Sequence, residues 1–282
     1  MAYLFIDVQH GLSNRLRAMA SAAVIARASG RELVVVWRPD HHCEARIGDL
    51  LDYDGLVIED SDPDILSRGA ARVYNYMEIE EGAQFRAPVD PSDIAGDVYI
   101  RSAYTLESPL RNDRDEAAFL RALRPCAAVL ELVYGVARPS DVALHVRMAT
   151  GPAFDHLSYE SPANWPPERH QELIEWRQKS DISRFVARLD RLLEERPVDS
   201  LFVAADLPAT YAALIERYGD RVRHLPRTLY DRSARQLQYG LADVILLSAA
   251  PLFLASNWSS FSDLAQRLAR PGRRVERSGL DF

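Results

Sequence analysis

Residues 3–37 read YLFIDVQHGLSNRLRAMASAAVIARASGRELVVVW, and this stretch decides the fold class. It opens with a compact apolar run, Tyr3–Val8, and closes with a valine-rich run, Glu32–Trp37. Between them apolar residues recur at helical spacing over Ser13–Ser29, and Gly30 follows at the position where helices commonly end. Strand, helix and strand in this order predict a βαβ unit with parallel strands.

The same alternation continues along the chain, although residues 40–96 show only short, ambiguous pieces. The other expected strands are Val98–Ser102, Asp141–Val146, Leu201–Ala205, Val222–Leu225 and Leu252–Ser256. The other expected helices are Arg114–Leu123, Ala127–Ala137, Glu168–Gln178, Ile182–Arg196, Pro208–Tyr218, Ser233–Ala250 and Ser259–Arg270. Two successive α/β cycles predict two Rossmann-like halves, joined near residues 125–140, with ligands outside the carboxyl ends of the strands.

The composition is that of an ordinary globular protein, with 48% hydrophobic residues and a formal net charge of −7. An acidic chain argues against nucleic acid as the main ligand, since a nucleic-acid backbone usually requires a basic surface. Two cysteines, Cys43 and Cys126, are too few for a disulfide framework and favour a reducing compartment. With neither a signal peptide nor a transmembrane segment expected, the predicted location is cytoplasmic.

The basic residues are arginines with the single exception of Lys179. This bias suggests a GC-rich bacterial source. It also means that an anion bound by this chain would meet planar guanidinium forks instead of ammonium groups.

Polar residues follow the first strand, in the stretch from His10 to Arg17. Gly11 would permit a tight turn, and Ser13 or Asn14 would cap the next helix, whose free amides favour an anion. A plain capped helix start with solvent-facing arginines explains the same residues. The stretch is not GxGxxG, so it does not indicate a nicotinamide dinucleotide site.

His145 and Arg147 stand on one side at the carboxyl end of the strand Asp141–Val146, where a phosphate would sit. The alternative to a phosphate site is structural: Arg147 would pair with an acidic residue at the edge of the strand, and His145 would be an ordinary core histidine. The long loop over residues 148–167 favours a binding role. Asp206 follows the strand Leu201–Ala205 and is expected to cap the helix at Pro208 or to orient a ligand.

The stretch Asn257–Ser262 follows a buried strand and opens a helix. Its three hydroxyls, Ser259, Ser260 and Ser262, together with the helix amides, would cradle a phosphate; simple capping is the alternative. Asp243 lies in an otherwise apolar helix and needs a partner, either a purine or an arginine.

These motifs, in this order, resemble the inverting fucosyltransferases that use GDP-fucose. This superfamily includes the bacterial nodulation and eukaryotic core α1,6-fucosyltransferases and the protein O-fucosyltransferases. The matching stretches are Gly11–Trp37, His145–Arg147, Leu201–Asp206 and Leu241–Ala265. The resemblance covers the first forty residues and most of the C-terminal half, and residues 40–140 match nothing in it.

The resemblance implies an α/β fold of the GT-B type, in which two facing Rossmann-like domains enclose a cleft. Residues 1–137 would form the acceptor-side domain and residues 138–282 the nucleotide-sugar domain. Arg147 would bind the β-phosphate and be catalytic. The other residues that would contact the donor are Gly11, Asn14, His145, Asp206, Asp243, Ser259, Ser260, Phe261 and Ser262.

The implied reaction is attack by an acceptor hydroxyl, of a glycan or another molecule, on the anomeric carbon of GDP-fucose, with inversion. Arg147 would carry the charge of the leaving phosphate, so no metal or other cofactor is expected. Asp155 is the preferred acceptor base, with Glu160 and Asp7 as alternatives. Core-fucosylating enzymes have a second arginine after the first, where this chain has Met148, which leaves the subfamily open.

The sequence is also compatible with other functions. The chain could use another nucleotide-sugar donor, or it could be a relative that binds nucleotide or sugar without catalysis. A phosphatase or kinase is disfavoured because the sequence lacks a P-loop and a nucleophile motif. The run His41-His42-Cys43-Glu44 suggests zinc only superficially, since adjacent ligands do not easily converge on one ion. Tyr159, Trp165 and Trp258 are candidate surfaces for stacking a sugar.

Overall fold

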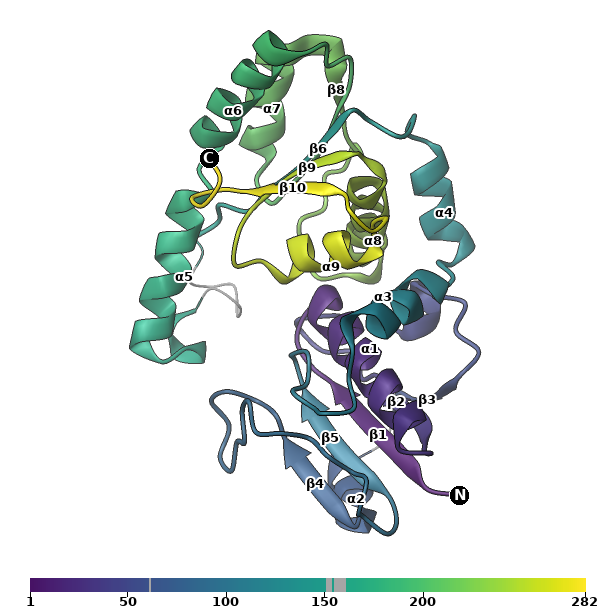
Figure 1. Cartoon of the computed structure of the whole chain (residues 1–282). Helices are drawn as coiled ribbons and strands as arrows, with labels where there is room; N and C mark the ends of the chain where they lie inside the picture. The colour runs from purple at the N-terminus through teal and green to yellow at the C-terminus, as the bar shows by residue number, and fades with distance from the viewer. Residues whose placement is uncertain (61, 151–153, 155–160) are drawn as a thin grey trace. The chain divides into compact units, whose positions relative to one another are not determined.

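The computed structural model describes residues 1–60, 62–150, 154 and 161–282. The chain forms two compact units (Figure 1). Unit 1 comprises Met1–Cys126 together with Arg232–Leu237, and unit 2 comprises Ala127–Asp231 together with Gln238–Phe282. None of the helices in the described residues is both long and apolar enough to cross a bilayer.

Unit 1 is built on a parallel sheet of five strands. In sheet order these are β3 (Leu56–Ile58), β2 (Glu32–Val36), β1 (Tyr3–Val8), β5 (Val98–Ser102) and β4 (Arg72–Asn75). The chain starts on the central strand β1, builds outward through β2 and β3, and then supplies β4 and β5 on the other side. The carboxyl ends of β1 and β5 therefore lie next to each other at the point where the strand order reverses, with Val8 opposite Ser102.

Helix α1 (Leu12–Ala28) covers β1 and β2, and α3 (Asp113–Ala122) packs against α1 (Figure 1). Alanine is the commonest of the buried residues of α1, and its small side chain allows the helix to approach the valine-rich sheet closely. The helix ends as predicted, because Gly30 adopts a φ of 68° directly after the C-cap residue Ser29. The short helix α2 (Pro63–Gly69) and the 3₁₀ turn Ile47–Asp49 complete unit 1.

Unit 2 repeats this plan with a second parallel five-stranded sheet. In sheet order its strands are β10 (Arg274–Arg277), β9 (Leu252–Ala255), β6 (Val142–Val146), β7 (Leu201–Ala205) and β8 (Val222–Arg223). The strand order reverses between β6 and β9, whose carboxyl ends are adjacent, with His145 opposite Ala255. Two parallel sheets with helices confirm the predicted α/β class.

The remaining helices are α4 (Ala127–Tyr134), α5 (Pro167–Lys179), α6 (Ile182–Glu195), α7 (Pro208–Tyr218), α8 (Ala234–Ala249) and α9 (Ser260–Leu268). Two 3₁₀ turns lie at Pro162–Asn164 and Gly219–Arg221. The core of unit 2 joins apolar residues of β6 and β7 to Phe185 and Leu189 of α6 and to Leu214 of α7. Because both faces of β6 are buried, this strand reads as a continuous apolar run interrupted only by His145.

Candidate functional site

The carboxyl ends of β6 and β9 are tied together by one hydroxyl. Ser256, the residue after β9, donates from its Oγ to the carbonyl of His145 at 2.8 Å and accepts from the amide of Arg147 at 2.8 Å. The amide of Ser256 also donates to the carbonyl of His145 at 3.0 Å. These bonds fix where the chain leaves β6, so the Arg147 side chain starts from a rigid position at the reversal of the strand order.

His145 is buried and contacts the start of α9. Its Nδ1 lies 2.8 Å from the Oγ of Ser262, and its ring packs on Phe261 with 4.7 Å between the ring centroids. Burial lowers the pKa of His145 to about 3; the charge of Asp206 opposes this shift, and those of Arg147 and Arg177 reinforce it. The imidazole is therefore neutral at pH 7. When Ser262 donates to Nδ1, the ring proton lies on Nε2.

We expect acid to destabilise unit 2 through His145. Below pH 6.5 the unfolded chain takes up a proton on this residue that the folded chain, with a pKa of about 3, does not accept, so stability falls as pH falls. The loss amounts to about 2 kcal/mol between pH 7 and pH 5. In His145→Asn, whose amide can occupy the place of Nδ1, urea unfolding should show a pH dependence reduced by that amount. An unchanged pH dependence would contradict the buried, neutral state of His145.

Arg147 is held by Asp206, which follows β7. Its Nη1 lies 2.6 Å from the Oδ2 of Asp206, and the two side chains are 16% and 13% exposed. Asp206 also accepts from the amides of Met148 and Ala149 at 3.0 and 2.8 Å. The expectation that Asp206 caps the helix at Pro208 is wrong: Leu207 is the N-cap residue of α7, and the carboxylate turns instead to the segment after β6.

Burial of Asp206 by itself disfavours its ionised form, but the charge of Arg147 and the two backbone amides outweigh burial and lower the pKa of the carboxyl. Asp206 is therefore an anion that orders residues 147–149. Because both partners keep some exposure at the end of the strands, the pair is not locked in the core, and an incoming anion can compete for the guanidinium.

The serine run Ser259–Ser262 opens α9, as the sequence predicts. Ser259 occupies the N-cap position with extended backbone, but its side chain makes no capping hydrogen bond within the described part of the chain. Ser262 is directed to His145 instead. The alternative that Ser259 simply caps α9 is therefore wrong. The first amides of α9 point away from the helix and are suited to an anion.

Trp258, directly before α9, has a left-handed backbone with φ 52°, which is strained for a bulky residue. Its ring lies 5.7 Å from that of Trp165, and the guanidinium of Arg169 lies 5.2 Å above it. Both indoles are partly exposed. The sugar-stacking role of these two indoles stays a prediction, and Tyr159, the third candidate, falls outside the described residues.

Asp243 of α8 is paired with an arginine, one of its two expected partners. Its Oδ2 lies 2.5 Å from Nη2 of Arg227, and both side chains are almost fully buried. Burial raises the pKa of Asp243 to about 6, although Arg227 pulls it down. Its Oδ1 has no hydrogen-bond partner within the described residues, so one acceptor remains for the predicted contact with guanine.

In unit 1, the residues that form the turn after β1 and cap α1 are not the ones predicted from the sequence. The left-handed residue is His10, with φ 62°, whereas Gly11 is an ordinary N-cap residue with φ −71°. Ser13 does not cap α1, since it is buried inside the helix. Asn14 does not cap it either, and its Oδ1 accepts from Arg17 at 2.8 Å.

Arg15 is fully buried, contrary to the alternative of solvent-facing arginines. Its Nε donates to the carbonyl of His10 at 2.7 Å and its Nη1 to the carbonyl of Arg38 at 2.7 Å. Its Nη2 lies 2.9 Å from Asp40. One side chain thus fixes the segments that follow β1 and β2, a role for which the sequence offered no signal beyond the residue type.

The predicted base Asp155 and its alternative Glu160 lie outside the described residues. The other alternative, Asp7, is fully buried and accepts from the side chains of two arginines, which suits a positioning role better than proton transfer. The ring centroids of His41 and His42 lie 4.1 Å apart, so the two imidazoles pack on each other. The described residues contain no group of three or more side chains arranged to hold a metal.

No family model matches the sequence, and no curated protein sequence matches it. Solved structures do. The crystal structure of NodZ alpha-1,6-fucosyltransferase soaked with GDP-fucose is 16% identical, with a TM-score of 0.60, and the match covers 95% of this chain and 93% of that chain. Fucosyltransferase NodZ from Bradyrhizobium is 15% identical, with a TM-score of 0.61 and coverages of 95% and 94%.

POFUT1 in complex with GDP-fucose is 14% identical, with a TM-score of 0.57, and the match covers 99% of this chain and 98% of that chain. These matches run over nearly the whole length of both proteins, so they include residues 40–140, which the sequence motifs did not reach. The chain has the α/β fold of these fucosyltransferases.

Proposed function

We propose that the protein is a glycosyltransferase that transfers fucose from GDP-fucose to the hydroxyl of an acceptor, with inversion, in the synthesis of a glycan. The observation that carries this proposal is the gathering of Arg147, Asp206, His145 and Ser262 at the reversal of the strand order in unit 2. Ligands of open parallel sheets bind at such points. The fold shared with proteins crystallised with GDP-fucose makes the diphosphate of a nucleotide sugar the fitting ligand.

The chemistry required of the chain is stabilisation of the departing phosphate. As the bond from the sugar to GDP breaks, negative charge grows on the β-phosphate, and donors fixed before the reaction lower the barrier. Arg147 is anchored through Nη1 on Asp206, and its planar guanidinium has the geometry for bidentate contact with phosphate oxygens. The first amides of α9 and the hydroxyl of Ser260 add neutral donors.

In this proposal Arg147 supplies the positive charge that a divalent ion supplies in other transferases, and transfer proceeds without a metal. Neutral His145 orients Ser262 and adds no charge to the site. Asp243 reads guanine through Oδ1, and Asp155 accepts the proton of the acceptor hydroxyl. Gly11, the N-cap residue of α1, and Asn14 in its first turn are assigned to donor binding from residues 1–137, the acceptor-side domain of the proposal.

Calorimetric titration with GDP, UDP and ADP tests which nucleobase the site prefers, and therefore which nucleotide sugar is the donor. We expect GDP to bind at least about tenfold more tightly than UDP or ADP, a difference of about 1.4 kcal/mol. EDTA should leave the affinity and the transfer rate unchanged. Equal affinity for the three nucleotides would remove the GDP-fucose assignment and leave a transferase with another donor, or a binding protein, as the better reading.

A further inference from the structure

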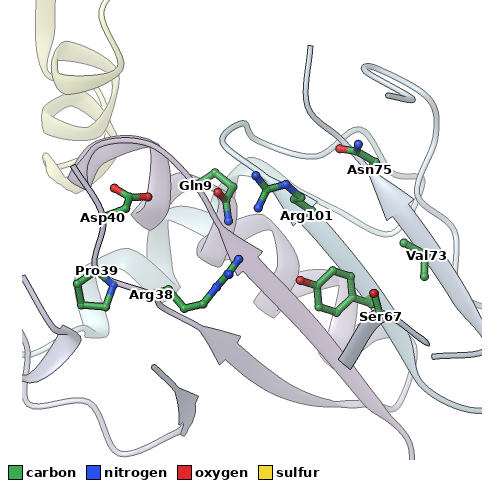
Figure 2. A pocket seen from close by; sticks show the side chains of 9 residues that line it. Gln9, Arg38, Pro39, Asp40, Ser67, Val73, Asn75 and Arg101 are labelled. Atoms are coloured by element: carbon green, nitrogen blue, oxygen red, sulfur yellow. The ribbon is translucent and has the colours of Figure 1, made fainter. Parts of the chain in front are cut away.

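A polar cavity of about 470 Å³ opens at the reversal of the strand order in unit 1, the counterpart of the Arg147 site in unit 2 (Figure 2). Its volume is that of a pocket for a small molecule. The side chains that matter for its chemistry are Gln9 after β1, Arg38 after β2, Arg101 at the end of β5, and Val73 and Asn75 on β4. Every one belongs to unit 1, so the cavity is complete within it.

The charges at the cavity are organised around Asp7, which is fully buried in β1. Its carboxylate accepts from Gln9 at 2.7 Å, from the hydroxyl of Tyr99 at 2.8 Å, from Nη2 of Arg38 at 2.9 Å and from Nη1 of Arg101 at 3.1 Å. With four donors around it, Asp7 holds these side chains in fixed positions along the wall of the cavity. A pre-ordered set of polar groups of this kind loses little side-chain entropy when a ligand binds.

The charged groups cancel one another. Arg38 and Arg101 face Asp7, Arg101 also pairs with Glu80 at 2.7 Å, and Asp40 pairs with buried Arg15. Nearby His10 adds no charge, because burial lowers its pKa, an effect that Asp40 opposes and Arg101 reinforces. Three guanidinium groups thus balance three carboxylates. Each positive charge therefore already has a counter-charge, so an anionic ligand meets no excess of positive charge, whereas a neutral ligand leaves these pairs undisturbed.

The remaining hydrogen-bonding capacity suits hydroxyl groups. In the guanidinium of Arg38, only Nη2 makes a hydrogen bond within the described residues, so the N–H groups of Nη1 are left as donors for a ligand. The side chain of Gln9 donates to Asp7 through its NH₂ group, so its amide oxygen is left as an acceptor. A sugar hydroxyl both donates and accepts, and therefore satisfies both kinds of group. The apolar part of the wall comes from Pro39, Val73 and the ring of Tyr99, and the carbon face of a sugar can pack on such a surface.

We propose that this cavity binds a neutral sugar residue of the acceptor, and that it selects against acceptors carrying a carboxylate or phosphate at that position. The proposal rests on the proposed function, since it supplies the acceptor that a fucosyl transfer needs. It assigns recognition to Arg38 and Gln9, with Asp7 as the positioning residue that holds them. The contacts of Asp7 with Arg38 and with Gln9 were not predicted from the sequence.

The test uses the full-length protein without donor and a variant that fills the cavity. Binding is measured by calorimetry for a panel of neutral oligosaccharides of two to four sugars and for matched oligosaccharides that carry a uronic or sialic acid. In Val73→Trp the indole should occupy the cavity and weaken the binding of neutral saccharides by about tenfold or more. Leu56→Trp, on the exposed edge strand β3 of the same sheet, is the matched control and should bind like the wild type.

A second variant tests the charge balance. Glu80→Gln removes one carboxylate and leaves the cavity with an excess positive charge, so the affinity for acidic saccharides should rise by roughly threefold relative to neutral ones. Melting temperature reports whether each variant is folded. The proposal is overturned if no saccharide binds, if acidic saccharides bind better than neutral ones to the wild type, if Val73→Trp binds normally, or if Glu80→Gln leaves the preference unchanged.

Titration of GDP into the same variants separates this proposal from the proposed function. Val73→Trp and Leu56→Trp should both bind GDP as the wild type does, because the nucleotide site is assigned to unit 2. Loss of GDP preference in the wild type would refute the donor assignment even where saccharides bind. Normal GDP binding with no saccharide binding would refute only the cavity.

Discussion

Arg147→Ala is expected to lower kcat for fucosyl transfer by about 10²- to 10³-fold, which corresponds to about 3–4 kcal/mol of lost transition-state stabilisation. The reason is that the guanidinium at the end of β6 is the one charged donor assigned to the departing phosphate, and alanine leaves only the amides and hydroxyls of α9. The measurement is the initial rate of transfer from GDP-fucose at saturating donor. The KM for the donor should change much less than kcat, because the contact strengthens as charge develops.

Because Arg147 pairs with Asp206, its loss could also act only by disturbing the structure. Two control variants separate a structural effect of Arg147 from a catalytic one. Arg217→Ala removes a surface arginine of unit 2 that pairs with Asp190, and it should keep full turnover. Asp206→Asn retains an oxygen for the amides of residues 148 and 149 but releases the guanidinium, so kcat should fall less than in Arg147→Ala. If Arg147→Ala melts normally and keeps full turnover, the catalytic role assigned to Arg147 is wrong.

Asp243→Ala is expected to reduce the free energy of unfolding by about 3–5 kcal/mol. Its partner Arg227 is almost fully buried, and removal of the carboxylate leaves a guanidinium without a counter-charge in the interior. Burial raises the pKa of Asp243 to about 6 and so works against its ionised form, and we expect most of the loss to come from the arginine left without a counter-charge. Urea or guanidinium unfolding at pH 7 measures the change.

Unit 2 contains a matched pair for this experiment. Asp190 and Arg217 are also 2.5 Å apart, but their side chains are 35% and 52% exposed, against 4% and 3% for Asp243 and Arg227. Asp190→Ala should therefore leave stability nearly unchanged, since water and salt replace the lost contact. If the two alanine variants lose equal stability, burial is not what makes the Asp243 pair important. The double variant Asp243→Ala/Arg227→Met should recover much of the loss.

The parts of the fold that were predictable are those whose pattern is local. The strands β7 and β5 and the helix α7 have the bounds expected from sequence, because a continuous apolar run or an early proline marks them. The strands β3, β4 and β10 were not predicted. They have three or four residues each, and the exposed residues within them break the apolar signal. Each gains its place through hydrogen bonds to a better-buried neighbouring strand, which is β2 for β3, β5 for β4 and β9 for β10.

The sequence predicts which residues belong to the candidate site, but it does not predict which of them contact each other. A polar residue at a strand end is visible in the sequence, and His145, Arg147, Asp206 and the serines of α9 were found in this way. The identity of their partners was not, although an acid paired with Arg147 was one of the two readings of the sequence. Ser262 is 117 residues from His145, and the carboxylate of Asp206 turned away from its own helix to Arg147. Local capping rules fail there because a charged partner across the sheet binds the carboxylate more strongly.

The sequence alone determined the parallel α/β architecture, the positions of the central strands and the gathering of polar residues at their carboxyl ends, since these follow from the spacing of apolar residues along the chain. The tertiary structure decided which strand ends are neighbours. Only the strand order brings β6 beside β9 and β1 beside β5, and through that order Asp7 meets Arg38 and Arg101. Hydrogen bonds and ion pairs act over a few ångströms in space, and separation along the chain does not predict that distance.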